Sequence, residues 1–342
     1  MTIYAVAYAV SSPFLTVFSG RLQRRSVVLL GLGLVFIGAL FSAVAPTTGA
    51  LYASRVLVAF GAALYTPTAA LIAMTISDPA RRMRGLSLVV GGLTGAQILG
   101  VPLGTFIGGA FGWRWGMVVT LPITAVAAVM IARLVPRDIS FHAPTFATFA
   151  NALRDWRLGL VIAVMAVMGS GQYMVSAYIS PIVSQAMGAD ADVLSIILII
   201  FGVAALAGNL VGGAMGDRLG PVRTLLILLS VTAVTCLLFP LMTGSLFMTA
   251  LVMALWGFSC FACMPPQQAR VVMLSPAAGG VALSLNATAI YVSTAVGAAL
   301  GGAVIAWHGT TALPMAAIGF IIAGIALLLF SDRVLCRTAA AK

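Results

Sequence analysis

The sequence predicts an all-α integral membrane protein, and three observations lead to this fold class. Of its 342 residues, 62% are hydrophobic and 7% are charged, with no glutamate, so the chain cannot cover itself with a solvated polar surface. Long apolar segments fill most of it without the two-residue alternation of barrel strands, which leaves helices as the structure that satisfies the backbone in lipid. Basic residues recur in every second gap between those segments.

Eleven segments are long and apolar enough to span a hydrocarbon core about 30 Å thick. In chain order they are residues 3–18, 27–44, 51–76, 86–111, 115–132, 158–183, 193–215, 224–243, 246–264, 281–307 and 311–330. The first could be mistaken for a signal peptide. It lacks a basic start and runs directly into an arginine-rich loop, so we interpret it as a retained span.

The basic gaps give the orientation of the chain. Sixteen of the 18 Lys and Arg residues lie in every second gap, and only Arg114 lies in the gaps between. By the positive-inside rule, the basic gaps and the C-terminus face the cytoplasm. The net charge of +11 then belongs beside anionic lipid headgroups, so no nucleic-acid partner is expected. We expect a monomeric, multi-pass protein of a bacterial cytoplasmic (plasma) membrane.

The chain repeats itself at an offset of 197 residues. Arg21-Leu22 falls on Arg218-Leu219, Pro79-Ala80 on Pro276-Ala277, Leu86-Ser87-Leu88 on Leu283-Ser284-Leu285, Gly100 on Gly297, and Leu103-Gly104 on Leu300-Gly301. Two halves of like orientation form a parallel repeat. The predicted organisation is a bundle at residues 1–134, a cytoplasmic loop at 135–157, a second bundle at 158–332 and a basic cytoplasmic tail at 333–342.

The repeat also predicts a helix before Met1. The second half opens with a span at residue 158, whose counterpart in the first half would begin about 40 residues upstream of Met1. An odd number of spans with a cytoplasmic C-terminus places Met1 outside, and one further helix would return the N-terminus to the cytoplasm. Two explanations stay open, a start codon assigned too late and a truncated copy.

The segment from Gly213 to Gly220 has the pattern Gly-x-x-x-Asp-Arg-x-Gly and resembles a loop motif of the major facilitator superfamily. The segment from Thr16 to Arg25 is a weaker copy, with Gly20 at the acidic position and Gln23 at the last glycine. The resemblance implies the major facilitator fold, here with 11 of the usual 12 helices, and an Asp–Arg latch between helix ends. The implied gating residues are Arg21, Arg24, Arg25, Asp217, Arg218 and Gly220. A solvated charged turn is the alternative.

Arg55 lies inside an apolar segment, where an arginine at the bilayer centre costs about 2.5 to 3.5 kcal/mol. The segment from Leu51 to Arg55, followed by Gly61, resembles the fourth-helix motif of the superfamily, in which a membrane-embedded arginine is linked to proton coupling. Val58 and Ala59 replace two usual residues of that motif. The alternative is a side chain that snorkels to the outer headgroups.

A glycine series in the fourth predicted span resembles the fifth-helix motif of the drug and proton antiporter branch, closest to arabinose, sugar and purine efflux relatives. Its members are Gly95, Gly100, Pro102, Gly104 and Gly108, followed by Gly112-Trp-Arg114. Glycines at four-residue steps let another helix approach closely, and a proline bends the segment. We expect a tight seam that hinders ion leakage. Ordinary small-residue packing is the alternative.

Polar and aromatic side chains within the spans are candidates for a substrate cavity near mid-depth, where this architecture places its binding sites. They are Gln97, Gln172, Tyr173, Asn209, Trp256, Asn286 and Tyr291. Hydrogen bonding between helices is the alternative role for each. No span holds a mid-depth acid, which disfavours a permanently cationic substrate unless the missing helix supplies one.

The expected function is secondary transport, because the sequence has no phosphate-binding loop for an ATP-driven pump. An enzyme is disfavoured, since no nucleophile elbow or HExxH motif occurs, and no cofactor is expected. Cys260 and Cys263 have metal-like spacing but no second ligand pair, so no metal site is expected. The resemblance implies proton-coupled efflux of a small molecule, such as a sugar, a nucleoside or purine, or a drug-like compound. The alternatives are a facilitated-diffusion uniporter and a truncated protein that does not transport.

Overall fold

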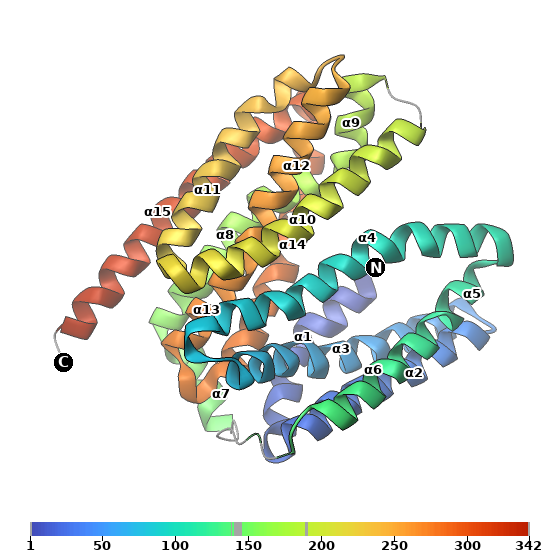
Figure 1. The fold of residues 1–342 in the computed structure, drawn as a ribbon, viewed down its shortest axis with the longest axis vertical. Helices are drawn as coiled ribbons and strands as arrows, with labels where there is room; N and C mark the ends of the chain where they lie inside the picture. The colour runs from blue at the N-terminus through green and yellow to red at the C-terminus, as the bar shows by residue number, and fades with distance from the viewer. Residues whose placement is uncertain (1, 138, 140–145, 189–190, 341–342) are drawn as a thin grey trace. The chain divides into compact units, whose positions relative to one another are not determined.

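In a computed structural model, which describes residues 2–137, 139, 146–188 and 191–340, regular structure within those ranges is entirely helical (Figure 1). The α-helices are α1 Thr2–Phe18, α2 Arg24–Val44, α3 Thr48–Ile76, α4 Arg82–Phe111, α5 Trp113–Val118, α6 Thr120–Leu134, α7 Phe146–Arg154, α8 Trp156–Ser176, α9 Ile179–Met187, α10 Ala191–Leu219, α11 Pro221–Leu238, α12 Leu246–Ala262, α13 Met264–Leu274, α14 Gly279–His308 and α15 Leu313–Ala340. Short 3₁₀ turns join several of them: η1 Ser19–Arg21, η2 Pro79–Arg81, η3 Phe239–Met242, η4 Pro276–Ala278 and η5 Thr310–Ala312. The predicted all-α class is confirmed.

Nine helical stretches of the described residues are long and apolar enough to cross a membrane. They account for nine of the eleven predicted spans. The span predicted at 3–18 is the shorter helix α1, and the span predicted at 86–111 lies in the 30-residue helix α4. The exact count of eleven therefore stays a prediction.

The structure divides several predicted spans. The span at 158–183 becomes α8 and α9, and the span at 246–264 continues beyond α12 as α13. Arg270 is one of the basic residues predicted for the cytoplasmic gaps, in the gap between the spans at 246–264 and 281–307, and its prediction as a loop residue is wrong. It lies in α13 with 5% of its surface exposed, where its guanidinium donates a hydrogen bond to Ser331 Oγ at 2.6 Å.

The chain forms two compact units, which group residues differently from the predicted bundles. The first comprises Met1–Ile76, Leu99–Arg154 and Val272–Thr288, and the second comprises Ser77–Ile98, Asp155–Val271 and Ala289–Lys342. In the first, α2 packs on α3 and α6, and α1 packs on α3. In the second, α10 packs on α12 and α8 packs on α15. The first part of α4 thus belongs with helices of the second half, and the bundle boundaries stay a prediction.

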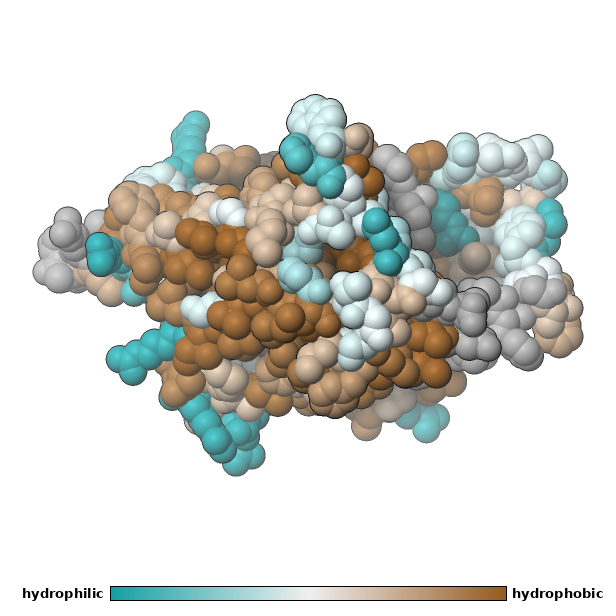
Figure 2. All heavy atoms as spheres, turned by 90° about the horizontal axis from the view of Figure 1, so that it is seen from above, coloured by the Kyte–Doolittle hydropathy of each residue, from teal (hydrophilic) through white to brown (hydrophobic). Residues whose placement is uncertain are grey.

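Large apolar side chains cover much of the surface. Trp307 is 79% exposed, Leu134 is 71% exposed and Phe247 is 70% exposed. In the view of Figure 2 apolar residues dominate the face, and only scattered hydrophilic side chains project from it. Water would disfavour this much exposed apolar surface, whereas hydrocarbon does not. The surface is that of a multi-pass membrane protein.

Candidate functional site

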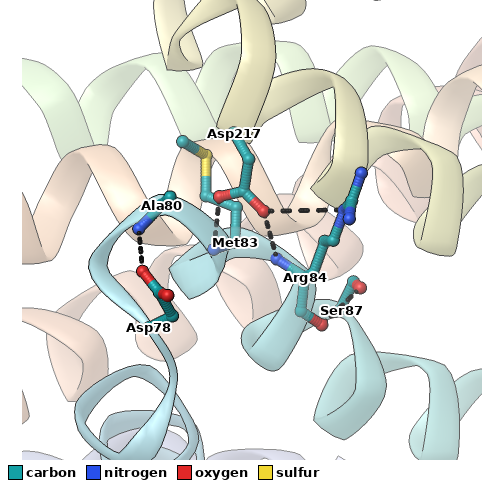
Figure 3. Close-up of polar contacts among 6 residues, drawn as sticks. All are labelled: Asp78, Ala80, Met83, Arg84, Ser87 and Asp217. Atoms are coloured by element: carbon teal, nitrogen blue, oxygen red, sulfur yellow. Dashed lines mark hydrogen bonds and ion pairs between the residues drawn. The ribbon is translucent and has the colours of Figure 1, made fainter.

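Asp217, near the end of α10, caps the first turn of α4 (Figure 3). Its Oδ1 accepts a hydrogen bond from the backbone N–H of Met83 at 2.9 Å, and its Oδ2 accepts one from the N–H of Arg84 at 3.0 Å. First-turn N–H groups have no partner within their own helix, and the positive end of the helix dipole favours a carboxylate there. Arg84 Nε lies 4.0 Å from Oδ2, although the Arg84 side chain is 41% exposed and Asp217 only 6%. We call the contacts of Asp217 with Met83 and Arg84 the latch.

Glycines let α10 approach α4 closely enough for the latch to form. A Cβ built on Gly213 would lie 2.7 Å from the Met83 carbonyl oxygen and 2.7 Å from Ser87 Cβ. A Cβ on Gly216 would meet the Met83 sulfur, the far end of a flexible side chain. Further along the same pair of helices, Gly91 of α4 faces Leu206, Asn209 and Leu210 of α10 at ordinary contact distances. These residues form the α4–α10 seam.

Gly220 ends α10 with φ +80 and is followed by Pro221 at the start of α11. Glycine is needed at that φ, because an L-residue there clashes with its own backbone. In the first copy Gln23 has φ −57, so the turn is built differently. The side chain of Arg218 is exposed, and among the described residues we find no ion pair between it and Asp217. The basic partner of the latch is Arg84, which the sequence pattern identifies only as one of the loop arginines.

Gly220→Ala should lower thermal stability, because the backbone at φ +80 and ψ +159 lies in a region adopted almost only by glycine, where an L-residue costs about 1 to 3 kcal/mol. Gly92→Ala is the matched control. Gly92 lies inside α4, and no described atom lies within 4 Å of a Cβ placed there, so alanine should be neutral or stabilise by about 0.5 to 1 kcal/mol. Melting temperatures in detergent would measure both. Equal values for the two variants would contradict a need for glycine at position 220.

The first copy of the motif makes different contacts. Arg25 donates hydrogen bonds to the carbonyl of Val135 at 3.3 Å and to that of Ala132, and so caps the C-terminal end of α6. Arg24 is buried at the start of α2. The side chain of Arg21, in η1, lies outside the described residues. Gly20, the counterpart of Asp217, has no carboxylate, so the first copy makes no latch like that of the second.

Arg55 is half-buried in α3, and its Nη2 lies 2.6 Å from the sulfur of Met117 at the end of α5. A thioether is a weak acceptor. Among the described residues no carboxylate forms an ion pair with Arg55. Beside it, Ser54 hydrogen bonds to Ser42 of α2 at 2.7 Å. Arg55 therefore lies in a helix that is long and apolar enough to cross a membrane, and it has no ion-pair partner among the described residues.

The glycines of the predicted seam differ in packing from their repeat counterparts in α14. A Cβ on Gly297 would lie 2.6 Å from the Ser170 carbonyl of α8, and one on Gly301 would lie 2.7 Å from the Tyr178 ring. Their counterparts lie in α4, which continues as one helix through Pro102. No described atom of its own unit lies within 4 Å of a Cβ on Gly95 or on Gly100, and Gly108 meets only the Trp113 backbone at 3.9 Å. The surroundings of Pro102 and Gly104 lie outside the described residues.

The cavity candidates lie on five helices, α4, α8, α10, α12 and α14. Trp256 is fully buried in α12 and donates its indole N–H to Ser176 Oγ of α8 at 3.2 Å, on the helix that also carries Gln172 and Tyr173. Asn209 lies at the α4–α10 seam. Asn286 is buried in α14, Tyr291 is half-buried further along the same helix, and the side chain of Gln97 lies outside the described residues. A hollow of about 300 Å³ between Ile107, Phe111, Trp115 and Val119 is lined by none of these candidates.

Residues 1–179 and again residues 160–337 match the family model of the Major Facilitator Superfamily. The chain belongs to this superfamily. It is 30% identical over 344 residues to the uncharacterized MFS-type transporter YbcL of Bacillus subtilis, across 97% of this chain and 86% of the relative. It is also 30% identical over 334 residues to the inner membrane transport protein YdhP of Escherichia coli K12, across 96% and 84% of the two chains.

Solved structures agree with the superfamily fold. The human organic anion transporter MFSD10 superposes with a TM-score of 0.78 at 20% identity, over 95% of this chain and 82% of that one. The fucose:proton symporter FucP of E. coli superposes with a TM-score of 0.77 at 12% identity, over 96% and 89%. At these identities the likeness shows the fold alone. The predicted family is confirmed, and this superfamily member is a multi-pass membrane protein whose family and relatives point to small-molecule transport and not to an enzyme.

Proposed function

We propose that this protein is a secondary transporter that moves a small molecule by alternating access and that the α4–α10 latch closes its cytoplasmic side. The observation that carries the proposal is the cap that Asp217 makes on α4. The cap joins a helix of the first half of the repeat to a helix of the second. Halves that rock apart on the cytoplasmic side must break this contact, because the basic loops on either side of it face the cytoplasm.

The strength of the latch suits a gate. Hydrogen bonds to a charged group contribute about 1.5 to 3 kcal/mol each, and the exposed Arg84 adds about 1 kcal/mol or less. A contact of a few kcal/mol holds one state well populated, and substrate or proton binding can still overcome it.

We further propose that transport is proton-coupled efflux and that the substrate is a sugar, a nucleoside or purine, or a drug-like compound. Support comes from the uncompensated Arg55 and from the antiporter-like glycine motif of α4. FucP, whose fold this chain shares, is named a fucose:proton symporter, so the architecture accommodates proton coupling. A uniporter and a chain that does not transport are the alternatives.

A helix preceding Met1 is part of the proposal. The glycines of α14 pack against α8, while the counterpart Gly100 of α4 is open within its unit. By the 197-residue repeat, the counterpart of α8 would lie upstream of Met1. We expect about 35 to 45 in-frame codons upstream that encode a basic start and one apolar span. A stop codon directly upstream, with the short form expressed, would instead establish a true truncation.

Flux into proteoliposomes with an imposed pH gradient tests the function. Labelled L-arabinose and labelled inosine are the substrates, and both the 342-residue chain and any upstream-extended chain are used. At least one flux should rise with the gradient and fall when an ionophore collapses it. Flux that ignores the gradient would replace antiport by facilitated diffusion. If neither form shows flux, the result would support the alternative that this protein does not transport.

Arg55→Ala should slow gradient-driven flux about tenfold, because the proton-linked step then lacks this cation, and a tenfold change corresponds to about 1.4 kcal/mol of barrier. Arg55→Lys keeps the charge and loses the planar donor fork, so it should be intermediate. Arg114→Ala is the control, because Arg114 lies in the first turn of α5 and donates to the Ala45 carbonyl at 3.1 Å. Flux without a gradient should change little in any variant. If Arg55→Ala and Arg114→Ala respond equally to the gradient, Arg55 has no part in coupling.

A further inference from the structure

Asn209 is the most unusual polar group of the α4–α10 seam. Its side chain is fully buried in α10, and both Oδ1 and Nδ2 lack a hydrogen-bond partner among the described residues. A carboxamide can donate two hydrogen bonds and accept two, and burying it without partners is unfavourable. Most buried polar groups in folded proteins are satisfied, so this exception requires an explanation.

The position of Asn209 explains why it has no partner. Across the seam lies Gly91, where a built Cβ would come 3.9 Å from Nδ2 and close to the side chains of Leu206 and Leu210. Glycine offers no side-chain partner, and backbone groups inside α4 are used by the helix itself. Across the seam the amide therefore faces a glycine, beside the apolar side chains of Leu206 and Leu210.

In the proposed transport cycle, the closed latch keeps Asn209 covered. Asn209 lies two helical turns before Asp217 on α10, about 12 Å along the helix axis. It is also within about 6 Å of the midpoint of α10 (Ala191–Leu219), the depth at which such transporters bind substrate. In that proposed cycle, opening the latch would separate α4 from α10 and expose the amide to the cytoplasmic side.

We propose that Asn209 is a substrate-binding residue that the closed latch conceals and that it binds a neutral solute with a hydrogen-bond donor and acceptor side by side. The proposal rests on the proposed transport function. No described acid or base contacts the amide, so a neutral ligand fits better than an ion. A purine edge pairs with a carboxamide in this bidentate manner, and a vicinal diol of a sugar offers the same pair of groups.

The proposal couples binding to gating. A solute that binds the exposed amide binds only the open seam, so it must shift the equilibrium away from the latched state. Conversely, weakening the latch should raise the apparent affinity, since the binding-competent state becomes more populated. The Asp217→Asn change should therefore tighten binding, although Asp217 itself does not touch the ligand.

Exposure of position 209 is tested by cysteine labelling. Asn209→Cys is made in a Cys336→Ser background, because Cys336 is the exposed thiol and Cys236, Cys260 and Cys263 are buried. N-ethylmaleimide should label the introduced thiol slowly with the latch intact and about 5- to 30-fold faster with Asp217→Asn. Ser259→Cys, buried in α12, is the control and should stay slow in both. Equal slow labelling at position 209 in both backgrounds would overturn both the gate and this proposal.

Binding is tested by thermal shift with inosine, hypoxanthine and L-arabinose, and with choline as the cationic comparison. At least one neutral probe should stabilise the protein, with an apparent affinity about 5- to 30-fold higher in Asp217→Asn. Asn209→Leu should abolish the shift, Asn209→Gln should retain part of it, and Thr232→Val, a buried change in α11, should keep it. If the thiol at position 209 becomes exposed but Asn209→Leu binds as well as wild type, the gate stands and this proposal fails. Absence of a shift with every neutral probe also overturns it.

Discussion

Gly213→Ala should open the α4–α10 seam, whereas the same substitution at Gly91 should leave it closed. A Cβ at position 213 would press on the Met83 carbonyl, and backbone inside a helix cannot move aside. Overpacking of this kind costs about 1 to 3 kcal/mol, roughly a 5- to 160-fold shift in the seam equilibrium. A Cβ on Gly91 would make only ordinary contacts of 3.5 to 3.9 Å. The two variants add the same methyl group to the same seam.

Hydrogen exchange of the Met83 and Arg84 amides measures the latch directly, because both N–H groups bond to Asp217. In Gly213→Ala, in detergent or nanodiscs, these amides should exchange several-fold faster, while in Gly91→Ala they should keep wild-type protection. Gly216→Ala should be intermediate, since the flexible end of the Met83 side chain can rotate away. Wild-type protection in Gly213→Ala would show that close approach at Gly213 does not hold the latch.

Asp217→Asn should weaken the latch by about 1 to 2 kcal/mol and slow transport more than any comparable change in the first copy. Asparagine keeps one acceptor oxygen, loses the other, and loses the charge that the first turn of α4 stabilises. Exchange of at least one of the two latch amides should then be about 5- to 30-fold faster. Gly20→Asp, which puts an acid at the equivalent position of the first copy, should change transport less.

Asp78→Asn is the matched control for Asp217→Asn. Asp78 is a neighbouring acid that caps the 3₁₀ turn before α4 by accepting from the Ala80 N–H at 2.9 Å, on the other side of the turn from Asp217 (Figure 3). Its replacement should leave the Met83 and Arg84 amides protected. Equal transport by wild type and Asp217→Asn would remove the latch from the transport cycle, whatever the exchange data show.

Several functional features were accessible from single positions in the sequence. The loop motif occurs twice in the sequence, and only the second copy has an acidic residue, Asp217. In the structure Asp217 accepts two backbone hydrogen bonds. Gly220 could be predicted because positive φ is a local property of the chain. The partner of Asp217 could not be named in the same way. Met83 and Arg84 contribute backbone N–H groups, which leave no signature in the residue type.

The glycine pattern shows that the internal repeat does not predict how each helix packs. Gly100 and Gly297 occupy equivalent positions, yet only Gly297 is pressed against another helix within its unit. Small residues permit close approach but do not supply the helix that approaches. Arg25 and Arg270 make the same point, because the sequence predicts both as loop charges, whereas the first caps α6 and the second is buried against Ser331.

The sequence by itself determined the all-helical membrane class, the parallel repeat and the superfamily, because span length, charge alternation and loop motifs are properties of short stretches of chain. The tertiary structure decided which helix α10 faces, where Asp217 finds its donors, and that Asn209 is buried without a partner among the described residues. Those facts depend on how helices far apart in the chain rotate and cross. Residue types restrict the crossing and rotation of the helices but do not determine them, because one stripe of glycines can pack against several different helices.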